Sequence, residues 1–249
     1  MYDIEDILLK YNVTPTLLTA SQKQMLSRLL SAPNSAEIEE FLERTQSDLH
    51  ALSAQLQNLA DGMLHLLDEV SHVMDNALGS AENAVSISDA SSIAELNELH
   101  VRILSQTNIC YERIAQTAAK FINLQTMEKE SILSPDFLSL AIIFHIVLQE
   151  IDGAPSKVFK KILDEKESPQ VQTSKLLQQF GNLLTTVNDV LSRFITQAAQ
   201  TVAEIGRGKQ AQAKYFALLR TEQQILHQLK EETNRIKKEA QYVQISDVL

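Results

Sequence analysis

The sequence is poor in the residues that end helices and build turns. Its 249 residues include 6 glycines, 5 prolines and no tryptophan, and aromatic residues make up only 5% of the chain. Glycine and proline mark turns, so their scarcity predicts few turns and long secondary-structure elements. Helix-favouring leucine, alanine, glutamine, glutamate and lysine are abundant, and no segment alternates convincingly with a period of two. The composition therefore predicts an all-α fold.

Cysteine and positive charge are also scarce. Cys110 is the single cysteine, so no internal disulfide can form and nothing favours an oxidising compartment. The formal net charge is −10, which disfavours nucleic acid and anionic membranes as main partners because both attract basic surfaces. The acidic start of the chain lacks the basic and apolar regions of a signal peptide, which predicts a cytoplasmic location. Export by a route without a cleaved signal stays open.

Long apolar runs are limited to one segment, from Phe137 to Leu148. A helix needs about 20 apolar residues to span a bilayer, and a run of about 10–14 is more often a buried core helix. Ser134 and Pro135 are typical of a helix start, and Gly153 is typical of a helix end. The segment therefore predicts a helix of about four turns that is apolar on all sides and packed among other helices.

The region after Pro33 carries a regular heptad pattern. Apolar residues follow each other at alternating steps of four and three for more than five repeats, which predicts one helix of about 45 residues and left-handed winding against its partners. The positions of this seam are Ile38, Leu42, Thr45, Leu49, Leu52, Leu56, Leu59, Met63, Leu66, Val70, Val73 and Ala77.

A second long helix is predicted from about residue 93 to residue 132, after a short polar turn at 86–92. Because the turn is short, this helix should fold back antiparallel on the first. Its apolar positions combine steps of four, four and three with steps of three and four, which predicts a straighter helix than the first. They are Leu96, Leu99, Ile103, Thr107, Cys110, Ile114, Ala118 and Phe121.

These patterns predict a single domain: an elongated antiparallel bundle of about three long coiled-coil-like helices with short helices at one end. Short helices occupy residues 1–33, a long helical hairpin 34–133, and the apolar helix with a short helix 134–167. A long C-terminal helix occupies 168–249, in which Gly206 and Gly208 form either a hinge or a turn. Its polar second half is expected to project or to pair with another chain.

Histidine and carboxylate residues gather on one face of the heptad helix between residues 61 and 75. His65, Asp68 or Glu69, and His72 lie about one turn apart, a spacing that can bind zinc, iron or manganese. This face lies about 200° from the heptad seam, so a solvated surface or a seam against another helix is favoured. The paired Glu-x-x-His pattern of bundle di-metal sites is absent. The sequence therefore predicts no metal or cofactor, and these four residues are the candidate ligands.

Other residues with chemical potential have plainer interpretations. His145 is predicted to be a buried neutral imidazole bonded to an acceptor, with proton sensing as the alternative. Cys110 is predicted to be a small buried apolar residue. The one basic cluster consists of Lys230, Arg235, Lys237 and Lys238. Glutamates are interleaved with it, so ion pairing along a solvated helix is favoured over nucleic-acid binding. No catalytic residue is predicted.

The favoured function is that of a non-enzymatic scaffold, adaptor or subunit of a larger assembly. Its partners would be other proteins or a second copy of the chain, reached through the heptad seam and the C-terminal helix. The order of long helices around an apolar insert, from about Ile38 to Val243, resembles the layout of pore-forming toxins of the cytolysin A type. That resemblance implies the alternative function, in which residues 137–148 are a shielded segment that inserts into a membrane.

Overall fold

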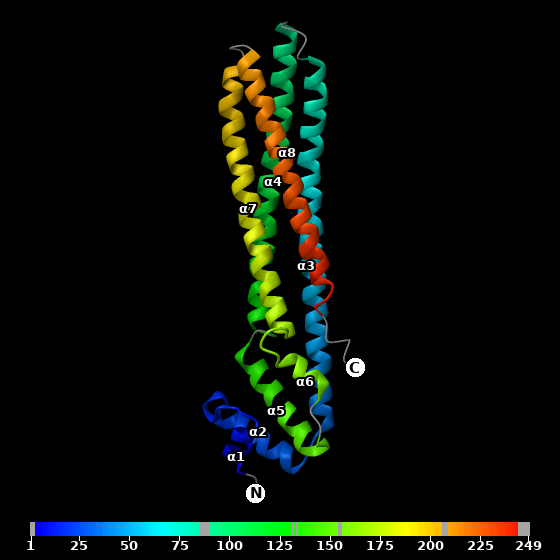
Figure 1. Cartoon of the computed structure of the whole chain (residues 1–249), viewed down its shortest axis with the longest axis vertical. Coiled ribbons are helices and arrows are strands. Elements are labelled where there is room, and N and C mark those ends of the chain that lie inside the picture. Colours follow the sequence, from blue (N-terminus) through cyan, green and yellow to red (C-terminus); the bar gives the residue numbers. More distant parts are fainter. Residues whose placement is uncertain are drawn as a thin grey trace. The chain divides into compact units, whose positions relative to one another are not determined.

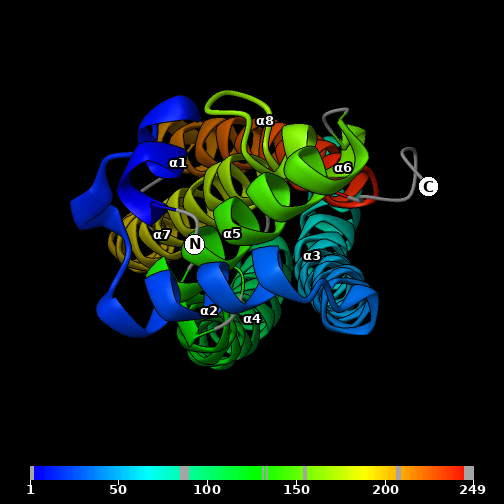
Figure 2. The same ribbon diagram turned by 90° about the horizontal axis from the view of Figure 1, so that it is seen from below.

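The computed structural model describes residues 3–84, 90–130, 132, 134–153, 156–205 and 209–243. Within these ranges the regular secondary structure is helical and no strand is present, which confirms the all-α bundle. Figures 1 and 2 show the helices from two directions. In chain order they are α1 (Ile4–Lys10), the short 3-10 helix η1 (Pro15–Leu17), α2 (Ala20–Ser31), α3 (Ser35–Ala84), α4 (Ala90–Glu130), α5 (Pro135–Asp152), α6 (Lys157–Ile162), α7 (Pro169–Ile205) and α8 (Lys209–Ala240).

The predicted long C-terminal helix is two helices, α7 and α8, so the bundle has four long helices where about three were expected. The two helices run in opposite directions (Figure 1). Residues 206–208, where a hinge or a turn was left open, lie outside the described residues, as do 86–89 of the turn predicted at 86–92. Helix α3 extends past Gly79 to Ala84, as the sequence allowed.

The chain divides into two compact units. Unit 1 comprises Met1–Gln55, Leu124–Leu177 and Ala240–Leu249, and unit 2 comprises Leu56–Asn123 and Gln178–Glu239.

Unit 1 is built around the apolar helix α5. The Ser134 hydroxyl accepts a hydrogen bond from the Phe137 amide at 3.1 Å, and Gly153 ends the helix at a φ of 67°, as the sequence predicts. Ile143 and Val147 are fully buried, and α2 lies along α5. The helix is not covered on every side, because Leu138 is 43% exposed.

An aromatic cluster joins α5 to its neighbours in unit 1. The ring of Phe41 on α3 lies 5.1 Å from Phe137, 5.2 Å from Phe144 and 6.1 Å from Phe159 on α6. Such ring pairs contribute about 0.5–1.5 kcal/mol each beyond the area they bury. The cluster therefore fixes α5 and α6 against the first turns of α3.

Helix α2 starts later than the first helix-start signal before it. Thr14 and Pro15 are residue types typical of a helix start, but Pro15 begins only a 3-10 turn. The α-helix begins after Thr19, whose hydroxyl accepts from the Gln22 amide while the Gln22 side chain accepts from the Thr19 amide. This capping box satisfies two terminal amides and so places the helix start five residues downstream.

Unit 2 contains the later part of α3, most of α4 and α7, and nearly all of α8. Cys110 lies against Leu66 and Gln106 against Glu69, so α3 and α4 are antiparallel, as predicted. Apolar residues at steps of four and three along α7 are buried in unit 2: Phe180, Leu184, Val187, Leu191, Phe194 and Ala198.

Helix α8 packs inside unit 2. Leu219, Leu226 and Ile236 are fully buried, so the expectation that the polar second half of the C-terminal segment projects is wrong. One residue in every three or four along α8 faces the core, and most of these residues are apolar, whereas most of the glutamines and charged residues are on the outer face.

Only some positions of the predicted heptad seam of α3 are buried. Leu56, Met63 and Leu66 are buried as predicted, but Leu59 is only partly buried, and Ala60 beside it is fully buried. From Leu56 on, the fully buried positions still keep steps of four and three, and one of the two columns is shifted by one residue while the other is not. They are Leu56, Ala60, Met63, Leu67, Val70, Met74 and Ala77.

Candidate functional site

The residues of the candidate metal stripe are exposed or bound to different partners. His65 Nε2 lies 3.3 Å from Glu69 Oε1, whereas Asp68 pairs with Lys230 of α8 at 2.9 Å. His72 is exposed. Among the residues that the structure describes, no three histidine, cysteine or acidic side chains come together as a group that could hold a metal ion.

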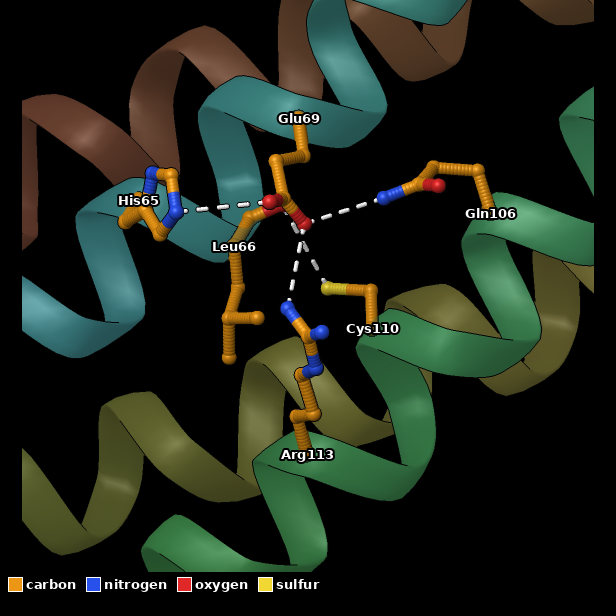
Figure 3. Close-up of polar contacts among 6 residues, drawn as sticks. All are labelled: His65, Leu66, Glu69, Gln106, Cys110 and Arg113. Carbon is orange, nitrogen blue, oxygen red and sulfur yellow. Dashed lines mark hydrogen bonds and ion pairs between the residues drawn. The ribbon is translucent and has the colours of Figure 1, made fainter.

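Glu69 is instead the centre of a polar network between α3 and α4 (Figure 3). Its Oε2 accepts a hydrogen bond from Gln106 Nε2 at 3.0 Å and lies 3.4 Å from Arg113 Nη1. Oε1 faces His65. The side chain of Glu69 is 30% exposed, so these contacts hold one helix against the other at the rim of the core and bring no two chemically reactive groups together.

Cys110 lies beneath this network and is fully buried. Its Sγ donates to the Leu66 carbonyl oxygen at 3.6 Å. Burial, with a smaller effect from the Glu69 carboxylate, raises the pKa of the thiol to about 12. The nucleophilic form is the thiolate, so Cys110 is a packing residue at neutral pH.

The basic cluster of α8 makes contacts that the sequence did not predict. Lys230 and Lys237 reach across to Asp68 and Asp61 of α3, the second pair at 2.6 Å, instead of pairing along their own helix. Arg235 does pair within α8, with Glu232 and with Glu239. Two of the four members of the cluster thus pair with carboxylates of α3, and Arg235 pairs with carboxylates of its own helix.

A buried polar pair lies in the core of unit 2. His100 Nδ1 of α4 and the Tyr215 hydroxyl of α8 are 3.0 Å apart, and the two rings meet edge to face at 5.5 Å. His100 is 5% exposed and Tyr215 is fully buried. Burial lowers the pKa of His100 and raises the pKa of Tyr215, so both side chains are neutral near pH 7.

Glu222 is another polar residue buried in this core. It is 5% exposed, and its Oε1 has no hydrogen-bond partner in the part of the chain that the structure describes. Burial raises the pKa of the carboxyl to about 7, although the nearby charge of Arg193 on α7 acts in the opposite direction. A buried carboxyl with an unsatisfied oxygen costs free energy when it is ionised, so Glu222 lowers the stability of this core.

His145 in unit 1 differs from its prediction in one respect. Burial, followed by the charge of Lys160, lowers its pKa, which keeps the ring neutral as expected. The expected acceptor is missing, because Nδ1 is buried without a hydrogen-bond partner among the described residues. The ring lies 6.5 Å from that of Phe159. His145 is therefore a packing residue of the α5–α6 contact.

The surface feature of unit 2 that stands out is the outer face of α4. Val101 is 63% exposed, Ile122 is 60% exposed and Ile109 is 39% exposed. In the described part of unit 2, every large hydrophobic side chain that is exposed lies on this one helix. Val101 and Ile122 point to about the same side of α4, and an exposed helix side that carries apolar side chains is a candidate interaction site.

Sequence reasoning missed His100, Tyr215 and Glu222 because it chose the more apolar neighbours Leu99 and Phe216. Both of those are only partly buried. The missing signal was the register itself: His100 lies four residues after Leu96 and three before Ile103, as a core position should. Glu222 fits between Leu219 and Leu226 in the same way. The exposed face of α4 could have been found from the same register.

Comparison of the chain with protein-family models, with curated proteins and with solved structures gives no match.

Proposed function

We propose that this chain is a non-enzymatic helical protein that acts by binding other proteins, as a scaffold, adaptor or subunit of a larger assembly. The outer face of α4 supports this proposal. The heptad seam of α3 and the apolar face of α8 are used inside the chain, so the apolar groups left for a partner in unit 2 are those on α4.

Burial of the exposed apolar side chains of α4 against a partner would contribute to the free energy of binding. Fully burying a valine or isoleucine side chain contributes about 1.5–3 kcal/mol. Val101 and Ile122 together would therefore add several kcal/mol to binding, before the costs of association are subtracted. The polar networks around Glu69 and Lys230 join the helices of unit 2 to each other. Beside Val101, Glu98 and Arg102 pair with each other within α4.

Site-specific photo-crosslinking in cells of the native host tests the proposal. With Asn108, which is exposed on α4, replaced by benzoylphenylalanine, we expect a cross-linked protein that disappears when Val101→Glu is added. Benzoylphenylalanine in place of Asn58, which is exposed on α3, is the matched control and should give no such product. The absence of any product from position 108 would contradict the proposal.

A membrane-inserting function is the second candidate. It is favoured by the exposure of Leu138 (43%) and Ile151 (46%) on α5, the most apolar helix of the chain. None of the helices in the described ranges is long and apolar enough to cross a membrane.

A further inference from the structure

Helix α4 carries two parallel heptad seams. The buried seam runs through Leu96, His100, Ile103, Thr107, Cys110, Ile114 and Phe121. The residues that directly follow these seven positions, together with the residue that follows position 117, form a second seam. It lies about 100° further around the helix. We call it the outer stripe of α4; it consists of Asn97, Val101, Leu104, Asn108, Tyr111, Ala115, Ala118 and Ile122.

The outer stripe contains no charged residue, although the chain has 22 basic and 32 acidic residues. Val101 and Ile122 are among the most exposed apolar side chains of unit 2, and Leu104 and Tyr111 are partly buried. An uncharged seam that keeps steps of four and three is the pattern that accepts another α-helix, with side chains of one helix inserted between those of the other.

The order of residues in the stripe fits the same stripe running in the opposite direction. In an antiparallel pair centred between Asn108 and Tyr111, Val101 lies beside Ala118 and Leu104 beside Ala115. Val101 and Leu104 then each meet an alanine, and each Asn108 amide meets a Tyr111 hydroxyl, an acceptor and donor that can bond. The outermost pair is Ile122 with Asn97. Every contact occurs twice, as two-fold symmetry requires.

We infer that the outer stripe of α4 binds a second copy of this chain, antiparallel and in this register. The inference rests on the proposed function and names the partner. Two copies carry a formal charge of −10 each and repel one another, so the contact face should be one without charges. The outer stripe meets that condition over 26 residues, from Asn97 to Ile122.

The size of the stripe predicts a weak dimer. Twenty-six helical residues at 1.5 Å each make a strip about 40 Å long, which at a helix width of about 10 Å offers about 400 Å² per chain. Stable interfaces use about 800 Å² per partner, so we expect dissociation in the micromolar range or above.

Flanking residues give a test of the register. In the proposed pair, Glu112 of one chain lies closest to Ser105 of the other. Ser105→Lys should therefore strengthen the dimer by an opposite-charge contact, and Ser105→Glu should weaken it. Both changes are at an exposed position, so the fold is expected to survive them. Asn58→Lys and Asn58→Glu, on α3, are controls for the change in net charge alone.

Sedimentation equilibrium of the purified full chain, from about 10 µM to about 1 mM, measures the dimer directly. We expect Val101→Glu to weaken it at least about tenfold, because an aliphatic contact is replaced by a buried carboxylate. Leu17→Glu removes an exposed leucine in unit 1 and should have no effect. A chain that is monomeric throughout, or a dimer indifferent to Val101→Glu and to both Ser105 variants, would overturn the inference.

The photo-crosslinking experiment separates this inference from the proposed function. A product from position 108 with twice the mass of the chain, linked near Tyr111, supports the self-pairing. A product with a different protein overturns the self-pairing and leaves the proposed function in place. No product at all contradicts both.

Discussion

Lys230 Nζ lies 2.9 Å from Asp68 Oδ1, and this contact is the middle step of a regular ladder between α8 and α3. Seven residues away on each helix, Lys237 pairs with Asp61 at 2.6 Å, and seven residues in the other direction Gln223 donates to Asp75. The repeat of seven on both helices means that the ladder selects one antiparallel register out of several that the apolar faces would tolerate.

The contact between Asp68 and Lys230 should give a measurable coupling between the effects of the two substitutions on the free energy of unfolding. Asp68→Lys is expected to lower the free energy of unfolding by about 1 kcal/mol, because it places two ammonium groups side by side at a partly exposed site. The exchange Asp68→Lys with Lys230→Asp should recover most of that loss. Urea unfolding at low salt measures both, and 1 M salt should reduce the coupling. Strictly additive effects would show that the two side chains do not interact in solution.

The shifted seam of α3 gives a second prediction. Leu56 is 1% exposed, and Leu56→Ala should cost about 2–5 kcal/mol of unfolding free energy through lost burial and a cavity. Leu59, one heptad step further, is only partly buried, so Leu59→Ala should cost clearly less. Thermal and urea unfolding of both variants measure the difference. Equal losses would place Leu59 in the core that the strict heptad predicts.

This comparison shows what the sequence could predict about the long helices. Helix type, length and antiparallel order followed from the spacing of apolar residues and from the scarcity of glycine and proline. The exact buried column did not, because apolar residues stand at neighbouring positions, such as Leu59 beside Ala60, and either choice keeps steps of four and three. Leu56 and Met63 belong to both choices, whereas Leu59 belongs only to the predicted one.

The apolar helix α5 gives a prediction that bears on both candidate functions. Ile143→Asp would bury a charge at a fully covered position, so the variant should lose its cooperative melt or aggregate. Leu138→Asp, on the exposed side of the same helix, should melt like the parent. Circular dichroism during heating measures this.

Liposome binding extends the α5 experiment to the membrane alternative. If the parent binds liposomes and a well-folded Ile143→Asp protein does not, α5 is a membrane-insertion segment and the favoured function is wrong. A parent that does not bind liposomes removes the support for the alternative.

Glu222 should make stability depend on pH. Its pKa is about 7 in the folded chain, against an ordinary value of 4.5, so the folded state holds a proton that the unfolded state has released between these pH values. The free energy of unfolding should therefore fall as pH rises through this window, by at most about 3 kcal/mol at 1.36 kcal/mol per pKa unit.

The matching variant is Glu222→Leu, which removes the buried carboxyl from a core position. It should be more stable than the parent at pH 8, and this advantage should shrink below pH 4.5. Glu231→Leu, at an exposed position of the same helix, is the control. Urea unfolding at both pH values measures the effect. An advantage independent of pH would mean that the pKa of Glu222 is the same in the folded and the unfolded chain.

The contact between Tyr215 and His100 should be worth more than a surface hydrogen bond. Tyr215→Phe keeps the ring but removes the hydroxyl, which leaves His100 Nδ1 buried without this partner and should cost about 1–3 kcal/mol. Tyr242→Phe is the control, since Tyr242 is 79% exposed and should change little. Urea unfolding compares the two, and equal stability would show that the hydroxyl contributes nothing.

The buried polar residues mark the limit of reading hydrophobicity alone. Leu99 is more apolar than His100, and Phe216 more apolar than Tyr215, yet the less apolar residue of each pair is the more buried one. Geometry decides this, because only one residue per helical step can point at the core. The Tyr215 hydroxyl and the His100 imidazole then form a hydrogen bond with each other, which offsets the free-energy cost of burying them.

The position of Cys110 also bears on the motions of the molecule. It is the single thiol of the chain, it lies under the Glu69 network, and its sulfur is unreachable while α3 and α4 stay together. A thiol reagent can modify the native protein only during moments when this helix pair opens. The rate of labelling therefore reports the frequency of that opening, with no other cysteine to confuse the signal.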